Sequence, residues 1–562
     1  MRIGLGQFNA VVGDLSGNAE KMRQVYRQAL QHDVDVLLFP ELAICGYPPE
    51  DLLLKKHFLQ DNAEAIDELA ADCAEATIIV GFAEGREGNC YNSAAVLQNG
   101  SVSKIYRKAL LPNYGVFDER RYFQSGTEPL IVDLGEFRAA VTICEDIRDI
   151  EQLSSFLGFR HGQKTQERTG RTSQEQFQMV LNISAWPFYV GRSEQTEQMV
   201  RRCAKEFNCA VAYCNLVGGQ DELVFDGRSM LVDSTGTCVA KARAFEEDLL
   251  IADVKAGAGG GLGVELVGGA AQQPVGRLDE IYQALVLGTR DYTRKNGFGK
   301  VLLGLSGGID SSVTAAIAAA ALGAENVLGV TMPSNFSSAE TRADAQKLAE
   351  NLGIRIVSIP IEPMLAEFDR SLGTVDGWDN RGVAYENLQA RIRACILMSL
   401  SNQFGSLVLT TGNKSEVAVG YSTLYGDTAG GFAVLKDVPK TTVYELAGYI
   451  NDRATRAAIP ADVISRAPSA ELRANQKDTD TLPDYDLLDE ILKGYVEQDK
   501  SAQELAESGL PAEVVYRVVG MVDRSEYKRR QLPPGPRITP RAFGKDRRLP
   551  ITNCYNPGSA RS

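Results

Sequence analysis

The stretch that decides the fold of the second half of this chain is VLLGLSGGIDSS, residues 301–312. The apolar run that ends at Leu305 is typical of a buried strand, the Ser-Gly-Gly step predicts a tight turn, and a helix is expected from Ser312 through Ala321. Glycines let a turn point backbone N–H groups inward, serine hydroxyls add donors, and the positive end of a helix attracts anions. The stretch therefore predicts a phosphate-binding loop between a strand and a helix.

This loop lacks the lysine that follows the glycines of a Walker A loop, so it does not predict a kinase-like grip on a γ-phosphate. The string SGGIDSS, residues 306–312, resembles the loop of the N-type ATP pyrophosphatases, which cleave ATP between its α and β phosphates to adenylylate a substrate. The resemblance implies that ATP binds along this loop, to Gly304, Leu305, Ser306, Gly307, Gly308, Ile309, Asp310 and Ser311.

Length and composition limit the number of domains, the class of partner and the cellular location that the chain can have. A chain of 562 residues is too long for one core and predicts two or three domains. The formal net charge of −14 argues against nucleic acid or an anionic membrane as main partner, because no basic excess would displace phosphate counterions. The 10 cysteines form no Cys-x-x-Cys pair, which favours reduced thiols, and the chain enters a strand pattern without a signal-peptide core. We therefore expect a cytoplasmic protein.

Glycine density predicts where the chain divides. Residues 256–274 hold the densest glycine and show no sustained period, so we expect a linker between domains at 1–255 and 275–562. Before it, the expected strands are 34–39, 77–82, 139–143, 179–183 and 210–215. After it, strands at 301–305, 327–332, 355–359 and 407–411 alternate with helices at 310–322, 337–352 and 385–402. The first half predicts an α/β domain with mixed strands, and the second a doubly wound parallel sheet with ligands at the strand carboxyl ends. The polar run 160–178 predicts an exposed loop or insertion.

Three segments of the first half each present a reactive side chain just past an expected strand: FPEL at 39–42, RKALLP at 107–112 and ICED at 143–146. Together they resemble the Glu-Lys-Cys pattern of the nitrilase-like carbon-nitrogen hydrolases, which implies an α/β sandwich over residues 1 to about 250. By this resemblance Glu41 is the general base, Lys108 stabilises the tetrahedral oxyanion, and Cys144 forms a thioester that water hydrolyses. A carboxylate and an ammonium can activate a thiol without histidine.

The string LPNYGVFDE, residues 111–119, is more specific, and resembles the glutaminase domain of glutamine-dependent NAD synthetases. The resemblance implies that Tyr114 lines the glutamine pocket and that Glu119 supports the triad. Ammonia would then be the useful product.

Some positions depart from that family's pattern. Trp186 stands where the family usually has serine, so a hydroxyl contact to glutamine is missing or replaced by an indole face. Arg148 stands where the family often has tryptophan. Arg192 could still hold the substrate carboxylate as a charge-assisted pair. These departures make specificity for glutamine less secure than amide hydrolysis.

The second half also resembles NAD synthetase, from about 280 to 545. The matching strings are YENLQARIR at 385–393, LTTGNKSE at 409–416, GYSTLYGD at 420–427, PSAEL at 468–472 and YKRRQLPP at 527–534. By resemblance Thr411 contacts the nucleotide, and the deamidated dinucleotide is bound by Asn387, Glu416 and Lys528. Asp310 and Glu416 offer the hard oxygen ligands that Mg²⁺ prefers.

The combined resemblance implies one reaction, in which ATP adenylylates the carboxylate of deamido-NAD and ammonia from glutamine displaces AMP to give NAD. Because ammonia released into neutral water is mostly protonated, we expect an internal tunnel. The family's habit also implies a homo-oligomer.

Other uses of the phosphate loop remain open. A GMP or asparagine synthetase shares the loop, but such enzymes usually take ammonia from a Cys-His-Glu triad or an N-terminal cysteine, neither of which this chain offers. A free-standing amide hydrolase with a nucleotide-binding sensor would produce no AMP. Transfer-RNA thiolation is disfavoured by the acidic charge and the lack of paired cysteines.

Overall fold

The computed structural model describes residues 1–158, 177–256, 262–266, 275–469, 471–473 and 476–555. The chain forms two compact units, one of residues 1–220 and 224–275 and the other of residues 221–223 and 276–562. The predicted insertion at 160–178, except for its last two residues, lies outside the described residues. So does most of the predicted linker, although Leu262–Leu266 within it form strand β15.

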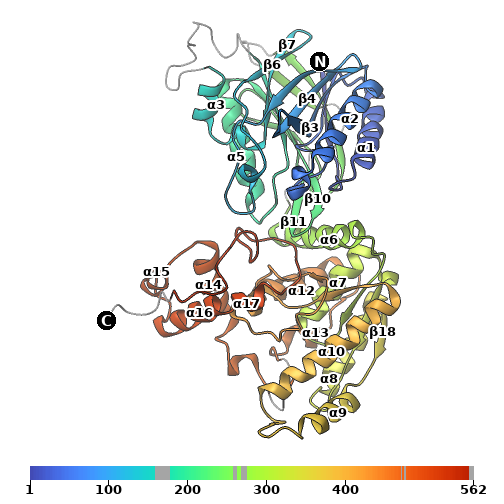
Figure 1. The fold of residues 1–562 in the computed structure, drawn as a ribbon, viewed down its shortest axis with the longest axis vertical. Coiled ribbons are helices and arrows are strands. Elements are labelled where there is room, and N and C mark those ends of the chain that lie inside the picture. Colours follow the sequence, from blue (N-terminus) through green and yellow to red (C-terminus); the bar gives the residue numbers. More distant parts are fainter. Residues whose placement is uncertain (159–176, 257–261, 267–274, 470, 474–475, 556–562) are drawn as a thin grey trace. The chain divides into compact units, whose positions relative to one another are not determined.

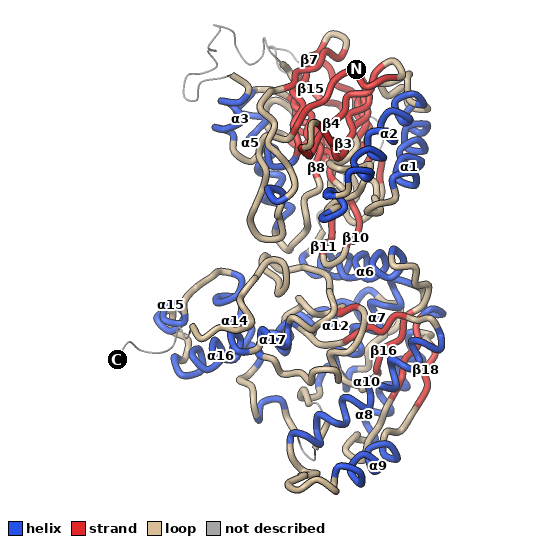
Figure 2. The backbone as a smooth tube through the Cα atoms, viewed as in Figure 1, coloured by secondary structure: helices blue, strands red, loops and turns tan. Residues whose placement is uncertain are grey.

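The first unit contains two sheets that face each other, with helices outside both, as the red strands between blue helices show in Figure 2. The first sheet has the order β15-β14-β1-β2-β3-β4-β5, in which β1, β2 and β3 are parallel. Its other strands are β1 (Arg2–Gln7), β2 (Val36–Leu38), β3 (Thr77–Arg86), β4 (Asn89–Gln98), β5 (Ser101–Arg107) and β14 (Asp248–Ala256). Helices α1 (Leu15–Leu30) and α2 (Lys56–Asp72) pack against it.

The second sheet has the order β13-β12-β9-β8-β7-β6, with β7, β8 and β9 parallel. Its strands are β6 (Leu130–Leu134), β7 (Phe137–Ile143), β8 (Met179–Ser184), β9 (Ala210–Asn215), β12 (Met230–Val232) and β13 (Cys238–Lys241). Helices α3 (Ile150–Phe156) and α5 (Arg192–Phe207) cover its outer side through a buried apolar cluster that includes Val180, Val200 and Phe207. A separate hairpin pairs β10 (Val217–Gln220) with β11 (Leu223–Asp226). The expected α/β sandwich is confirmed.

The second unit contains a parallel sheet of order β18-β17-β16-β19-β20. Its edge strand β18 is labelled in Figure 1. Its strands are β16 (Val301–Gly304), β17 (Val327–Thr331), β18 (Arg355–Ser358), β19 (Leu407–Thr410) and β20 (Phe432–Ala433). The chain leaves β16 toward β17 on one side and later returns to β19 on the other, so the carboxyl end of β16 lies at a topological switch point. The predicted doubly wound parallel sheet is confirmed.

Helices surround this sheet. One group consists of α6 (Arg277–Lys295), α7 (Ile309–Leu322), α8 (Ala339–Leu352) and α12 (Lys440–Arg453), all in contact with α7. A second group, α9 (Glu362–Leu372) and α10 (Val383–Phe404), packs on β17 through Val330, Ile361 and Ile392. The short helix α13 (Ala461–Ser465) contacts α8 and α12.

A further apolar cluster joins the end of α11 (Lys414–Val419), through Val417 and Val419, to the C-terminal helices. These helices are α14 (Tyr485–Leu492), α15 (Ala502–Glu507) and α16 (Ala512–Arg524); α17 (Glu526–Arg529) follows and contacts α16. None of the helices in the described part of the chain combines the length and hydropathy that a bilayer crossing requires.

Candidate active sites

The first site begins at Cys144, which follows β7 directly. Its backbone has φ +46°, a left-handed conformation that non-glycine residues seldom adopt, and its side chain is buried. Such local strain is characteristic of residues held in place for function. Burial raises the pKa of the Cys144 thiol well above its ordinary value; the charge of Glu41 acts in the same direction and that of Lys108 against it.

A buried ammonium lies between two carboxylates beside this thiol. Lys108 Nζ is 2.6 Å from Glu41 Oε1 and 2.9 Å from Glu119 Oε1, and the three side chains are almost inaccessible. Asn92 Nδ2 also donates to Glu41 Oε1 at 2.7 Å, and the Ala185 N–H donates to Glu41 Oε2 at 2.9 Å. Hydrogen bonds to both of its oxygens therefore hold the Glu41 carboxylate in one fixed orientation.

The charges of this cluster oppose one another. Burial alone would lower the pKa of Lys108, but Glu119 and Glu41 outweigh it and raise that pKa well above its ordinary value. Burial raises the pKa of Glu119 to about 7, although Lys108 and a hydrogen bond from Tyr47 at 2.9 Å favour the ionised form. The resting site thus contains a neutral thiol, a charged lysine and one carboxyl group that titrates near neutrality.

Asp146 ties the two halves of the site together, a role that sequence reasoning missed. Its Oδ1 accepts from the backbone of Ala109 at 3.1 Å and of Leu110 at 2.9 Å, directly after Lys108. Its Oδ2 accepts from Ile143 N–H and Tyr106 O–H, both at 2.8 Å. Burial raises the pKa of Asp146 to about 6, against these hydrogen bonds. The Cys-Glu-Asp motif was the available signal, since its third residue follows the nucleophile so closely.

Tyr114 and Arg148 meet at a cavity of about 1090 Å³ beside the first site. The Tyr114 hydroxyl lies 3.0 Å from both carboxylate oxygens of Glu145, and Arg148 Nη1 donates to Glu145 Oε1 at 2.8 Å. The Arg148 guanidinium also stacks 4.8 Å above the Tyr114 ring. Arg148, the position that departs from the family pattern, therefore covers one face of the predicted substrate tyrosine.

Trp186 and Arg192 also form a stacked pair. The Arg192 guanidinium carbon lies 4.0 Å from the centre of the buried Trp186 ring. Arg192 Nη1 donates to the Tyr189 hydroxyl at 3.3 Å, while its buried Nε has no hydrogen-bond partner in the described part of the chain. The indole thus supports the residue predicted to hold the substrate carboxylate. Tyr213 and Asp226, which the sequence did not indicate, line the same small pocket.

In the second site, the phosphate loop runs from β16 to α7 as predicted from its sequence. Gly307 has φ +81°, and a Cβ there would lie 2.0 Å from the Thr341 carbonyl oxygen, so only glycine fits. Ser306 Oγ lies 3.2 Å from Ser311 Oγ and accepts from the Gly308 N–H at 3.2 Å. Ser311 Oγ donates to the Gly308 carbonyl oxygen at 3.0 Å, so these hydroxyl and backbone groups lie together at the start of α7 and bond one another. A turn of this kind before a helix is a common setting for an anion site.

A cavity of about 310 Å³ opens onto this loop. Of the predicted ATP-binding residues, all but Gly307 line it: Gly304, Leu305, Ser306, Gly308, Ile309, Asp310, Ser311 and Thr411. Glu416 lines it as well, whereas Asn387 and Lys528 do not.

Asn387 and Lys528 instead hold the loop 420–428. Thr423 Oγ1 donates to Asn387 Oδ1 at 2.7 Å, and Lys528 Nζ donates to the carbonyl oxygens of Gly420 and Ser422 at 2.7 and 2.8 Å. Asp427 accepts from the Thr423 N–H at 2.6 Å and faces the cavity. The two residues predicted to bind dinucleotide thus contact the loop at the cavity's edge.

Asp310 and Glu416 are the predicted metal ligands. Asn413 and Lys440 each form hydrogen bonds with both of them and so link the two residues. Asn413 Nδ2 donates to Asp310 Oδ1 at 3.0 Å, and Asn413 Oδ1 accepts from the Glu416 N–H at 3.0 Å. Burial raises the pKa of Glu416 to about 7, and Lys440 opposes that shift. Two carboxylates facing a phosphate cradle fit Mg²⁺, which is commonly held by one or two carboxylates and substrate phosphates. Sequence reasoning missed Lys440, because nothing marks a single lysine at a helix start.

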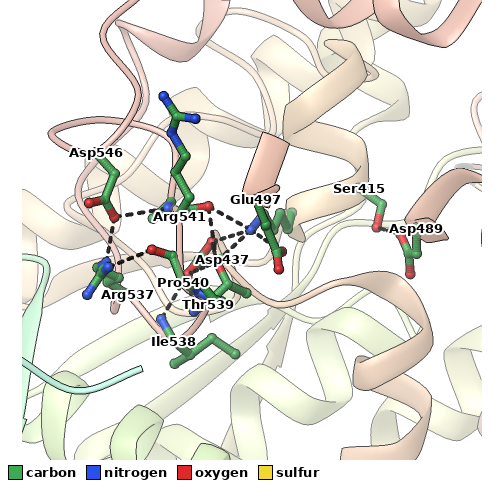
Figure 3. Close-up of polar contacts among 12 residues, drawn as sticks. Ser415, Asp437, Asp489, Glu497, Arg537, Ile538, Thr539, Pro540, Arg541 and Asp546 are labelled. Atoms are coloured by element: carbon green, nitrogen blue, oxygen red, sulfur yellow. Dashed lines mark hydrogen bonds and ion pairs between the residues drawn. The ribbon is translucent and has the colours of Figure 1, made fainter. Parts of the chain in front are cut away.

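A buried network fixes the start of α11, which carries Glu416 (Figure 3). Lys414 Nζ donates to Glu497 Oε1 at 2.8 Å and Thr539 Oγ1 at 2.6 Å, and lies 3.0 Å from Asp437 Oδ1. Asp437 in turn accepts from the Thr539 N–H at 2.7 Å. The C-terminal segment therefore anchors the turn that carries Glu416.

Comparison with known proteins follows the division into two units. The carbon-nitrogen hydrolase family model matches residues 2–260, and the NAD synthase family model matches residues 281–533. A glutamine-dependent NAD(+) synthetase of Thermotoga maritima is 43% identical, with 99% of each chain covered, and one of Aquifex aeolicus is 44% identical, covering 99% of this chain and 100% of the relative. The structure of a glutamine-dependent NAD+ synthetase from Acinetobacter baumannii in complex with ADP is 41% identical, with a TM-score of 0.77 and 98% of both chains covered.

Proposed function

Because this chain belongs to the family of glutamine-dependent NAD(+) synthetases, we propose that it converts deamido-NAD to NAD with ATP and with nitrogen taken from glutamine. The observation that carries this proposal is that one chain holds both a buried Glu41–Lys108 pair beside Cys144 and a phosphate loop opening on a cavity. The first supplies amide hydrolysis and the second nucleotide binding.

In the first site, the Cys144 thiol is the nucleophile and Glu41 takes its proton. Glu41 suits this role because its oxygens are oriented by Lys108, Asn92 and the Ala185 N–H. The Cys144 sulfur attacks the glutamine side-chain amide, ammonia leaves with the returned proton, and water releases glutamate from the thioester. Lys108 offsets the negative charge that develops on the carbonyl oxygen. Tyr114, Arg192 and Trp186 bind and orient the glutamine.

In the second site, the substrate carboxylate attacks the α-phosphorus of ATP, pyrophosphate leaves, and ammonia displaces AMP from the acyl adenylate. The hydroxyls of Ser306 and Ser311 and the Gly308 N–H bond one another in the nucleotide-free turn and exchange these bonds for the oxygens of the departing pyrophosphate. Asp310 and Glu416 would hold Mg²⁺, which would neutralise phosphate charge when bound. Positioning and charge neutralisation account for catalysis here, since all three histidines of the chain lie at or before His161.

The proposal extends to the setting of the enzyme. The unpaired cysteines support a cytoplasmic location, and the acidic balance disfavours nucleic acid and anionic membranes as partners. The family resemblance supports a homo-oligomer that uses small-molecule substrates.

Product accounting tests this function. The chain is incubated with deamido-NAD, ATP, Mg²⁺ and glutamine, and NAD, AMP and glutamate are quantified together, with parallel mixtures that each omit one substrate. The proposal expects NAD and AMP in equal amounts and none of either without deamido-NAD. Glutamate without AMP in every mixture would instead identify an amide hydrolase with a nucleotide sensor.

A further inference from the structure

Lys440 is a buried lysine to which the proposed reaction gives no role. It is the first residue of α12, and its side chain is 2% exposed. Its ammonium lies 2.5 Å from Asp310 Oδ2 and 3.3 Å from Glu416 Oε1, the two carboxylates proposed to hold the metal. Among the described residues, Lys440 is therefore the only cationic side chain that contacts both Asp310 and Glu416.

The backbone fixes this arrangement as well. The Lys440 N–H donates to Ser415 Oγ at 2.9 Å, so the start of α12 is tied to the residue before Glu416. The Tyr485 ring lies 5.2 Å from Lys440 Nζ and closes another side of the ammonium. A main-chain hydrogen bond and two ion pairs therefore both hold Lys440 at the carboxylate pair.

The charges explain why a lysine is needed there. Two carboxylates close together in a buried site repel each other, and a buried ammonium is costly unless it is paired. Lys440 and the carboxylate pair therefore neutralise one another in part. A divalent cation arriving alone would displace the ammonium and leave it unpaired, whereas a nucleotide would bring phosphate oxygens to pair with it.

We propose that Lys440 is the resident cation of the Asp310–Glu416 pair in the nucleotide-free enzyme, and that a divalent cation displaces its ammonium toward the phosphates in the same cavity. The proposal rests on the assignment of Asp310 and Glu416 as metal ligands. Such an exchange makes metal and nucleotide binding mutually favourable. The metal frees the ammonium for the phosphates, and the phosphates pair with the ammonium that the metal displaces. Lys440 also lines the cavity with the phosphate loop, as the exchange requires.

Metal binding without nucleotide gives the first test. Mn²⁺ affinity of the full chain is measured by titration calorimetry for the natural chain, for Lys440→Met, and for Lys477→Met, which removes an exposed lysine next to Asp478. Lys440→Met should bind Mn²⁺ at least 10-fold more tightly than the natural chain, and Lys477→Met should bind it equally. Equal or weaker binding by folded Lys440→Met would overturn the proposal. Adding Asp310→Asn to Lys440→Met should abolish the gain.

A second measurement uses the natural chain, so it does not depend on a variant folding. An amine-acetylating reagent labels accessible lysines, and peptide mass spectrometry reads the labelling of Lys440 with and without Mn²⁺. Lys414, equally buried but paired with Asp437 and Glu497, is the internal control. Labelling of Lys440 should rise at least 3-fold with metal while that of Lys414 stays constant. Unchanged Lys440 labelling at saturating Mn²⁺ would contradict the exchange.

Neither measurement involves turnover. NAD formation can therefore fail while the exchange holds, or succeed while the exchange is refuted, so the two proposals are tested separately.

Discussion

Glu119→Gln should make the stability of the first unit less dependent on pH. Burial raises the pKa of Glu119 from 4.5 to about 7, so its neutral form is favoured in the folded chain. The stability that the neutral form contributes is complete below pH 4.5 and is lost as pH rises through about 7. Glutamine cannot ionise, so the variant should not lose that stability.

The size of the effect follows from the two pKa values. Each tenfold change in proton affinity corresponds to about 1.4 kcal/mol, so ionising Glu119 in the folded chain costs about 3 kcal/mol. Because part of this cost is already present at pH 5, the natural chain should lose roughly 2–3 kcal/mol relative to Glu119→Gln between pH 5 and pH 8. The hydrogen bonds from Tyr47 and Lys108 reach Glu119 Oε1, and the amide oxygen of glutamine can accept both.

Tryptophan fluorescence provides the assay. The chain has 2 tryptophans, Trp186 in the first unit and Trp378 in the second, so a Trp378→Phe background leaves Trp186 as the reporter. Urea unfolding is followed at several pH values from 5 to 8 for this background and for Glu119→Gln within it.

The control is Glu68→Gln, at an exposed position of α2. It should follow the natural chain at every pH. The difference in unfolding free energy between Glu119→Gln and the background could instead stay constant from pH 5 to pH 8 or grow toward acid. Either result would show that burial does not raise the pKa of Glu119 in the folded chain.

Three further outcomes are expected. Asp310→Asn should lower NAD formation at least 100-fold while glutamate release from glutamine remains measurable; unchanged synthesis would remove Asp310 from the metal site. Trp186→Ala should raise the KM for glutamine about 5- to 30-fold, because it loses about 1–2 kcal/mol of stacking on Arg192. The KM of Trp186→Phe should stay close to that of the natural chain. Ammonia-driven synthesis, measured in parallel, should not change in either variant. Gly307→Ala should weaken ATP binding at least 10-fold in a calorimetric titration, because its Cβ would meet the Thr341 carbonyl 2.0 Å away; natural affinity would show that the turn is not the phosphate site.

The fold could be predicted because its signals are local. Apolar strands such as 301–305 end at turns rich in small residues, and helices begin just beyond them, so both the α/β class and the parallel sheet of the second unit follow from the order of elements. Glu41, Lys108 and Glu119 could be singled out by resemblance, and the structure places the Lys108 ammonium within hydrogen-bond distance of both carboxylates. Their catalytic roles stay predictions.

The missed residues act over long separations in sequence. Lys440 contacts Asp310 from 130 residues away, and nothing around it differs from an ordinary helix start. The Cys-Glu-Asp motif marks Asp146, but its contact with the Leu110 N–H spans 36 residues, and a backbone N–H leaves no mark in the sequence. Such contacts depend on how strands are ordered within a sheet, so local patterns could not show them.

The central claim is that nitrogen released at Cys144 is consumed at the phosphate-loop site. NAD formation by Cys144→Ala, supplied in turn with glutamine and with ammonium chloride at alkaline pH, tests it most directly. This variant should form no NAD from glutamine and undiminished NAD from ammonia. Loss of both activities in the folded variant, or NAD formation from glutamine, would contradict it.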